Sequence, residues 1–264
     1  MAPMSSRADD SVAGHWLLAR LGKRVLRPGG VGLTRTMLAG AEVTDADVLE
    51  LAPGLGRTAA EILARTPRSY VGAEQDPEAA ETVRGVIAGA GSGTVRVADA
   101  ADTGLPDASR DVVIGEAMLT MQGDATKHAI VAEAARVLRP GGRYAIHELA
   151  LTPDNVSEEI STEIRQSLAR AIKVNARPLT IAEWSGLLSD HGLVIDRVVT
   201  APMALLQPRR IIADEGLFGA LRFARNLLLN PDARNRVLTM RATFREHRER
   251  LTAVAIVARK PDDE

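Results

Sequence analysis

The sequence predicts an α/β fold whose sheet is doubly wound and mostly parallel. Short apolar runs alternate with helix-forming segments between residues 47 and 150, which is the rhythm of strand–helix–strand units. The first apolar run ends in a tight proline- and glycine-rich loop that leads into a helix pattern, as at the ligand sites of open α/β sheets. With 264 residues and an apolar fraction of 45%, the chain is long enough for one large domain with a full core.

Composition excludes several classes of protein. The net charge of −1 gives no general attraction to nucleic acids or membranes. The absence of cysteine excludes disulfides, thiolate metal sites and cysteine nucleophiles. No apolar run reaches the roughly 18 residues that a membrane-spanning helix needs. The first residues lack the apolar core of a signal peptide, so we expect a cytoplasmic protein.

Residues 41–150 are predicted to form the ligand-binding core. They follow an N-terminal part, 1–40, in which we expect a loose tail over 1–10 and two helices, Val12–Lys23 and Leu33–Ala39. The predicted strands of the core are Asp47–Leu51, Ser69–Glu74, Thr94–Ala98, Asp111–Gly115 and Gly142–Leu149. Helices over 57–65, 77–89 and 124–138 alternate with these strands, and a Pro-Gly break at Pro140-Gly141 ends the last helix.

Residues 151–264 are predicted to complete the same domain with a different rhythm. Two helix patterns, Val156–Val174 and Ile181–His191, precede a strand at Leu193–Thr200, and the last strand is Thr252–Arg259. The stretch 201–250 between these strands is predicted to be a helical insertion, with helices over about 209–229 and 231–249. It contains ten arginines and five acidic residues, an excess of five positive charges.

The loop after the first strand is the most informative feature of the sequence. Gly54 and Gly56 remove side chains where a ligand approaches the backbone. The stretch Gly54–Ala59 matches the dinucleotide pattern G-x-G-x-x-A, and Glu74 follows at a suitable distance. Glu50, however, stands just before the loop, where its negative charge would repel a pyrophosphate and suit a cationic ligand group.

In these residues the chain resembles the class I S-adenosylmethionine-dependent methyltransferases, over residues 45–150 and more loosely to its end. Their first motif stands here as Glu50-Leu51-Ala52-Pro53-Gly54-Leu55-Gly56, with Ala52 in place of the usual first glycine. The resemblance implies a Rossmann-like, seven-stranded sheet with an antiparallel C-terminal strand. It also implies S-adenosylmethionine as cofactor, S-adenosylhomocysteine as product, and cofactor contacts from Glu50, Ala52, Pro53, Gly54 and Gly56.

The resemblance places further cofactor contacts at the ends of the next two strands. Glu74 would accept hydrogen bonds from both ribose hydroxyls, since a carboxylate offers two oxygens to two donors, and Gln75 would flank the adenine. Asp99 and Ala100 would contact the adenine through a side chain and a backbone N–H. The alternative is that these residues are solvated turn residues. Asp76 itself is predicted to be the N-cap of the following helix.

Three polar residues stand at the ends of the fourth and fifth strands. Glu116 would face the cofactor or substrate, or act as a cap. His147 and Glu148 are the candidates for a catalytic base, because ligands gather at the carboxyl ends of such strands. Strand alternation sends these two to opposite faces, so at most one is expected in the site, and the alternative is a satisfied polar residue at a strand end. The other histidines show no metal-ligand pattern, and we predict no metal.

These observations favour a methyltransferase that acts on a small molecule by in-line methyl transfer. The insertion 201–250 would be a lid or wall over the site and would select an acceptor with apolar bulk; alternatively it would form a contact in a homodimer. One alternative function is an RNA or protein methyltransferase that docks through the arginines of the insertion. The scarcity of aromatic residues, 3% of the chain, argues against a base-stacking surface, so we expect no nucleic-acid partner. Another alternative is an NAD-dependent oxidoreductase or a cofactor-binding module without turnover.

Overall fold

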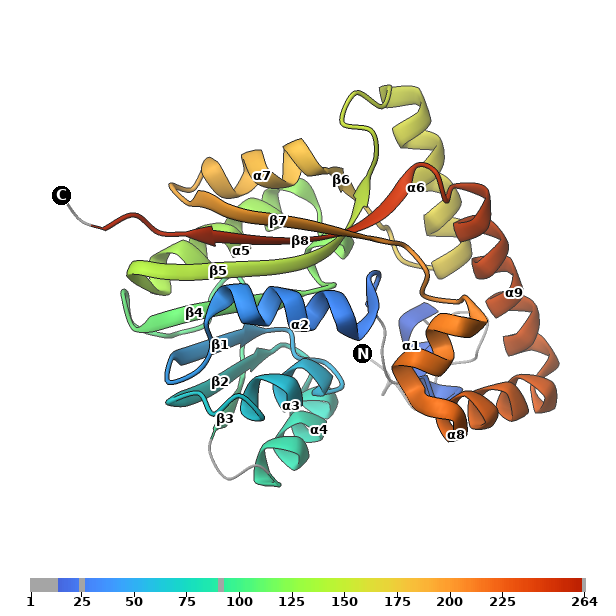
Figure 1. Ribbon diagram of the computed structural model, residues 1–264, viewed down its shortest axis with the longest axis horizontal. Helices are drawn as coiled ribbons and strands as arrows, with labels where there is room; N and C mark the ends of the chain where they lie inside the picture. Colours follow the sequence, from blue (N-terminus) through green and yellow to red (C-terminus); the bar gives the residue numbers. More distant parts are fainter. Residues whose placement is uncertain (1–13, 24–26, 90–92, 263–264) are drawn as a thin grey trace.

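A mixed β-sheet forms the centre of the computed structural model, which describes residues 14–23, 27–89 and 93–262 (Figure 1). The path through the sheet runs β3-β2-β1-β4-β5-β8-β7, and β6 pairs with β5 beside this path. The strands are β1 (Asp47–Leu51), β2 (Ser69–Glu74), β3 (Thr94–Val97), β4 (Arg110–Glu116), β5 (Leu138–Leu151), β6 (Leu179–Thr180), β7 (Val194–Pro202) and β8 (Leu251–Arg259). β8 runs antiparallel to both β5 and β7, and all other pairings of the described strands are parallel, so the predicted fold class is confirmed.

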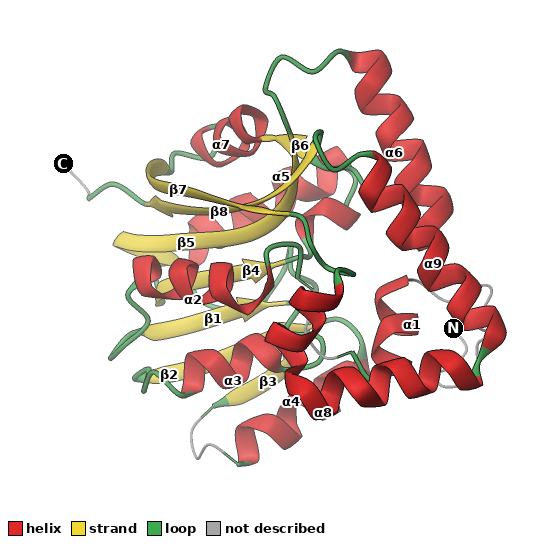
Figure 2. Cartoon of the chain, turned by 45° about the vertical axis from the view of Figure 1, so that its right-hand side comes forward, coloured by secondary structure: helices red, strands yellow, loops and turns green. Residues whose placement is uncertain are grey.

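Helices cover both faces of the sheet because the strands expose apolar residues alternately to each side. The helices are α1 (Gly14–Arg20), α2 (Gly30–Ala41), α3 (Arg57–Leu63), α4 (Pro77–Ala88), the 3₁₀ helix η2 (Leu119–Met121), α5 (Asp124–Val137), α6 (Glu158–Ile172), α7 (Ile181–Ser189), α8 (Pro208–Leu229) and α9 (Pro231–Glu246). Val48 and Val112 pack with α2, α3 and α4, whereas Leu49 and Val113 pack with α5 and α7. In Figures 1 and 2, α2 lies in front of the sheet and α5 behind it.

A separate group of helices stands at one end of the sheet. α1, α6, α8 and α9 lie together there in both views, away from the layers that cover the sheet faces. Leu17 and Leu18 of α1 share an apolar cluster with Phe223 of α8 and with Val237 and Met240 of α9. We call α8 and α9, with the segment that joins β7 to α8, the cap, because the sequence analysis predicted a helical insertion here and the structure confirms it.

The structure corrects several predicted boundaries. Eight strands occur among the described residues instead of seven, because the short β6 pairs in parallel with Ala150 and Leu151. β5 begins at Leu138 rather than Gly142, since Leu138 already pairs with Arg110 before the register shifts around the Pro-Gly-Gly turn. The predicted tail over 1–10 and the first two residues of the first helix lie outside the described residues.

The first cap helix is not the single regular helix that the sequence predicted. Gly216 interrupts α8 with φ 71° and ψ 172°, a conformation that favours glycine and that ends one helical segment and starts another. Among the described residues, no helix has the combined length and hydrophobicity that a membrane span requires.

Candidate active site

A cavity of about 300 Å³ opens where the parallel strands end, between the glycine-rich loop and the helical group at the end of the sheet. One side is formed by the loop residues Ala52, Pro53 and Gly54, with Glu74 at the end of β2. The opposite side is largely apolar and comes from α1, the region after β4, α6 and the cap, through Trp16, Met118, Met121, Ile172, Met203, Leu205, Met240 and Phe244. Ligand sites in open α/β sheets lie at this edge.

The glycine-rich loop turns sharply because three of its residues adopt positive φ. Ala52 has φ 50°, Gly54 φ 56° and Gly56 φ 69°. A Cβ atom on Gly56 would lie 2.9 Å from Cγ2 of Val86, so this glycine lets α4 pack against the loop. A Cβ atom on Gly54 would meet nothing closer than the carbonyl oxygen of Ala52 at 3.9 Å. Gly54 therefore leaves room on the cavity side, where a bound molecule can approach the backbone.

Glu74 faces the cavity and is held by the backbone of two loops. Its Oε2 accepts a hydrogen bond from the N–H of Gly54 at 2.9 Å, and its Oε1 accepts one from the N–H of Asp76 at 3.0 Å. A carboxylate has lone pairs for further donors beyond these two. Asp76 caps α4 by accepting hydrogen bonds from the N–H groups of Glu78 and Ala79, which confirms the predicted N-cap.

Gln75 and Asp99 lie at the exposed rim beside Glu74. The side-chain amide of Gln75 donates to Oδ2 of Asp99 at 3.3 Å, and Oδ1 of Asp99 accepts from the N–H of Ala101 at 2.8 Å. Neither these residues nor Ala100 line the cavity itself. The structure thus brings Gln75 and Asp99 together beside Glu74, outside the residues that line the cavity.

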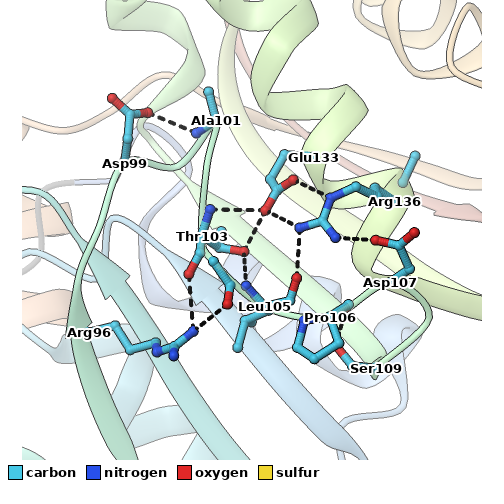
Figure 3. A network of polar contacts seen from close by, with 12 residues as sticks. Arg96, Asp99, Ala101, Thr103, Leu105, Pro106, Asp107, Ser109, Glu133 and Arg136 are labelled. Carbon is cyan, nitrogen blue, oxygen red and sulfur yellow. Dashed lines mark hydrogen bonds and ion pairs between the residues drawn. The ribbon is translucent and has the colours of Figure 1, made fainter.

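A polar network fixes the loop that carries Asp99 (Figure 3). Glu133 of α5 accepts from the N–H of Thr103 at 2.9 Å and from its hydroxyl at 2.5 Å. Arg136, one turn further along α5, donates to Glu133 at 2.7 Å and to the carbonyl oxygen of Leu105 at 2.8 Å. From β3, Arg96 donates to the carbonyl oxygen of Gly104 at 2.8 Å. The loop between β3 and β4 is therefore held from both sides.

Glu50 lies beneath the glycine-rich loop and does not line the cavity. Its side chain is buried, and Oε2 accepts a hydrogen bond from the hydroxyl of Tyr70 at 2.6 Å. Burial, supported by the nearby charge of Glu116 and opposed by the Tyr70 hydrogen bond, raises the pKa of Glu50 to about 8. Glu50 is thus a protonated acid over much of the neutral range when no ligand is nearby.

Glu116 is held in the cavity wall by four partners. Its oxygens accept hydrogen bonds from the hydroxyls of Thr34 and Thr58, and Oε2 lies 3.2 Å from Nε of Arg27. Oε1 lies 2.7 Å from Nδ1 of His147. Burial alone would raise the pKa of Glu116, but Arg27 and His147 outweigh it and lower this pKa to about 2. Glu116 is therefore an anion and a weak base.

Both nitrogens of the His147 ring have partners inside the protein. The N–H of Gly29 donates to Nε2 at 3.1 Å, so the ring proton stands on Nδ1 and is donated to Glu116. The side chain is fully buried and does not line the cavity. His147 thereby links the loop before α2 to the end of β4.

Glu148 points to the opposite face of β5, as strand alternation predicted. Its two oxygens accept four hydrogen bonds, from the N–H groups of Met118, Leu119 and Thr120 and from the hydroxyl of Thr120, at 2.7 to 3.1 Å. Burial raises its pKa in spite of these bonds. Glu148 lines the cavity and holds the turn η2 in place.

Sequence reasoning missed several residues that build the cavity. Arg27 and Pro28 line it from the loop before α2, and Thr58 lines it from the first turn of α3. The only sequence signal for Arg27 was its place in a Pro-Gly turn. The apolar residues of the cap were noted only as patches. Among the described residues, no group of three or more histidine or acidic side chains is placed to hold a metal ion.

The family described as "Methyltransferase domain" matches residues 48–142 of the chain. An uncharacterized protein of Haemophilus influenzae is 34% identical over 257 residues, which cover 96% of this chain and 100% of the relative. A 27-O-demethylrifamycin SV methyltransferase of Amycolatopsis mediterranei is 32% identical over 96 residues, 36% of this chain and 34% of that protein.

Among solved structures, phosphoethanolamine N-methyltransferase 2 of Haemonchus contortus, in complex with S-adenosyl-L-methionine, superposes with a TM-score of 0.69. Its sequence identity is 14%, and the match covers 94% of this chain and 57% of that one. Residues 48–142 thus form a methyltransferase domain, and the chain has the fold of the class I S-adenosylmethionine-dependent methyltransferases. This confirms the predicted family and cofactor and decides against an NAD-dependent oxidoreductase. The residues present fit this cofactor, because Gly54 leaves space on the cavity side of the loop in which a bound molecule could approach the backbone.

Alanine substitutions at the two loop glycines should separate binding from stability. Gly56→Ala should cost about 1–3 kcal/mol of unfolding free energy, because the methyl group overpacks against Val86 at a positive φ. Gly54→Ala should cost about 1–2 kcal/mol for the positive φ alone, but should weaken S-adenosylhomocysteine binding more than Gly56→Ala does. Urea unfolding and calorimetric titration measure the two effects. An unchanged affinity in Gly54→Ala would contradict the placement of the cofactor at this loop.

The pKa of Glu50 predicts a loss of stability as the pH rises. A carboxyl group whose pKa is raised on folding stabilises the folded state at low pH, and this contribution is lost between its unfolded value near 4.5 and about 8. The side chain of Glu50→Gln stays neutral, so this variant does not lose that contribution. Between pH 5.5 and pH 8, the unfolding free energy of the wild type should therefore fall relative to that of Glu50→Gln by at least about 1 kcal/mol. Urea unfolding at both pH values tests this, with the exposed Glu81→Gln as the control. Equal pH dependence in wild type and Glu50→Gln would show that Glu50 is ionised throughout.

Proposed function

We propose that this methyltransferase acts on a small molecule with an apolar body, which the cavity encloses beside the cofactor. The observation that carries this proposal is the cavity wall opposite the glycine-rich loop. Trp16, Met118, Met203, Met240 and Phe244 supply a continuous apolar lining, and three of these five residues belong to the cap. A wall of this kind favours an acceptor that gains by leaving water. Rifamycin and phosphoethanolamine, named for two similar proteins, differ so widely that the fold itself selects no acceptor.

The cofactor roles predicted for the strand ends remain proposals, and their contacts support them. Glu74 faces the cavity with lone pairs left for two ribose hydroxyls. Gln75, Asp99 and Ala100 at the neighbouring rim are proposed to border the adenine. Glu50 is proposed to act from below the loop, where a cationic ligand group would favour its ionised form.

When bound, S-adenosylmethionine supplies a methyl group that is already activated by its sulfonium. The chain's own contribution is then to bind, orient and exclude water. Among the described residues that line the cavity, Glu74, Glu116 and Glu148 are all held by hydrogen bonds or ion pairs, and Glu116 is a weak base because its pKa is about 2. These contacts favour an acceptor whose nucleophile needs no side chain to remove its proton.

His147 and Glu148 stay predictions as catalytic bases, and their contacts favour positioning roles. The ring of His147 uses one nitrogen as donor to Glu116 and the other as acceptor from Gly29. Both oxygens of Glu148 accept hydrogen bonds from the turn after β4. We propose that His147 orients Glu116 and that Glu148 shapes the cavity wall.

The alternative of an RNA or protein acceptor draws support from the arginines of the cap. Arg222 and Arg225 of α8 are exposed. Just before them in α8, however, Leu217, Phe218 and Leu221 are also exposed, with Phe218 at 87% exposure. Such an apolar helix face is a poor electrostatic track for a phosphate backbone, which argues against an RNA acceptor. The predicted homodimer and the cytoplasmic location stay expectations.

Glu74→Ala should weaken S-adenosylhomocysteine binding by about 1–3 kcal/mol, the range for a lost hydrogen bond to a charged group. The reason is that both the proposed ribose contacts and the anchor of the Gly54 N–H disappear together. Calorimetric titration measures the affinity, and Glu78→Ala on the exposed start of α4 is the control. If the Glu74→Ala protein binds S-adenosylhomocysteine as the wild type does, the proposed ribose contact is wrong.

The acceptor itself can be sought with isotopically labelled cofactor in metabolite extracts, followed by mass spectrometry of the products. For any acceptor so found, Phe244→Ala should raise KM by roughly tenfold, since removal of a large apolar wall residue costs about 1–3 kcal/mol of binding. The affinity for S-adenosylhomocysteine should stay the same. An extract in which only RNA or protein becomes labelled would overturn the small-molecule proposal.

A further inference from the structure

Arg27 presents an unused hydrogen-bond donor inside the cavity. It belongs to the loop that leads into α2, and its side chain is only 6% exposed. Nε of Arg27 lies 3.2 Å from Oε2 of Glu116. Nη1 is buried and has no hydrogen-bond partner among the described residues, and Arg27 is one of the residues that line the cavity.

The carboxylates nearest to Arg27, those of Glu116 and Glu50, leave its Nη1 without an acceptor. Glu116, which pairs with Nε of Arg27, is already held by Thr34, Thr58 and His147. A guanidinium remains charged at all relevant pH values, and a buried N–H without an acceptor is costly. The missing acceptor is therefore expected from a molecule that enters the cavity.

The loop holds Arg27 in a defined place, as a binding residue requires. Two residues after it, the N–H of Gly29 donates to His147, whose other nitrogen contacts Glu116. Two residues further, the N–H of Val31 donates to Oδ1 of Asp214 at 3.2 Å, which ties the loop to the first segment of α8. The guanidinium is thus positioned by β4, β5 and the cap together.

We propose that Arg27 is the carboxylate-binding residue of this cavity. The proposal rests on the proposed function, because it concerns a ligand of the same site. The planar fork of a guanidinium matches a carboxylate, and one nitrogen of Arg27 is free for it while Nε stays on Glu116. The three carboxylates that line the cavity, Glu74, Glu116 and Glu148, repel anions. The other guanidinium in the lining, that of Arg57, is exposed, so Arg27 is the buried cation that a carboxylate inside the cavity would meet.

Two ligands can bring this carboxylate, namely the methionine end of the cofactor and the acceptor. The first arm of the test titrates S-adenosylhomocysteine and 5′-methylthioadenosine, which lacks the amino-acid group, into wild type and Arg27→Gln. If the carboxylate is that of the cofactor, Arg27→Gln weakens S-adenosylhomocysteine binding by about tenfold to a hundredfold, the effect of a lost charged hydrogen bond, and leaves 5′-methylthioadenosine unchanged.

The second arm uses protein saturated with S-adenosylhomocysteine and follows tryptophan fluorescence, since Trp16 lines the cavity. Octanoate and octanol have the same apolar chain and differ in charge. If the carboxylate is that of the acceptor, wild type prefers octanoate over octanol by about tenfold or more, Arg27→Gln abolishes this preference, and S-adenosylhomocysteine affinity does not change.

Controls keep the test decisive. Arg27→Lys retains the charge but loses the fork, so it should fall between wild type and Arg27→Gln, and it replaces Arg27→Gln if that protein does not fold. Arg84→Gln, on the exposed face of α4, removes the same charge far from the loop and should change no affinity. Unchanged affinities in both arms for a folded Arg27 variant overturn the proposal. An extract in which only RNA or protein becomes labelled, with intact S-adenosylhomocysteine binding, would instead overturn the small-molecule acceptor. The two binding tests of Arg27 could still be carried out and interpreted.

Discussion

The buried carboxylate of Glu116 is the contact on which the site depends. It stands at the end of β4 and joins Thr34 of α2, Thr58 of α3 and His147 of β5. Its fourth partner, Arg27, comes from the loop before α2. A buried anion of this kind is stable only while its partners stay in place, so the contact holds four elements at fixed positions relative to one another. The glycine-rich loop leads directly into α3, so the contact between Thr58 and Glu116 also fixes the position of the loop.

Two neighbouring glutamates, Glu50 and Glu116, differ in pKa because their hydrogen-bond and ion-pair partners differ. Glu50 has one hydroxyl donor and its pKa is raised to about 8, whereas Glu116 has a guanidinium and an imidazole and its pKa is lowered to about 2. If both were ionised and unpaired, burial and mutual repulsion would destabilise the fold. The protein instead keeps one negative charge fixed beside Arg27 and a second acid that can ionise when a cationic ligand approaches.

Local sequence signals sufficed for the core of the fold and for the glycine-rich loop that lines the cavity. The strand, the glycine-rich loop and the helix from Asp47 to Leu63 are encoded by neighbouring residues, and Asp76 was recognisable as a cap because its partners lie within three positions. The kink at Gly216, the pairing of β6 and the role of Arg27 were not predictable in the same way. The last two depend on partners far away in the chain: Leu179 of β6 pairs with Ala150, and Arg27 contacts Glu116. No pattern of spacing reveals such a contact.

The contrast between local and distant contacts also applies to the two halves of the cavity, the side proposed to bind the cofactor and the side proposed to select the acceptor. The proposed cofactor contacts lie at the ends of β1 and β2, on a scaffold whose packing is set by the sheet. The proposed acceptor wall comes partly from the cap, which adds Met203, Leu205, Met240 and Phe244 and is anchored to the loop before α2 through Asp214. Because the cap enters between the last two strands, its side chains can change without disturbing the sheet register. Arg27 lies where the two parts meet, because its loop is tied to the cap through Val31 and Asp214 and its guanidinium contacts Glu116 of the core.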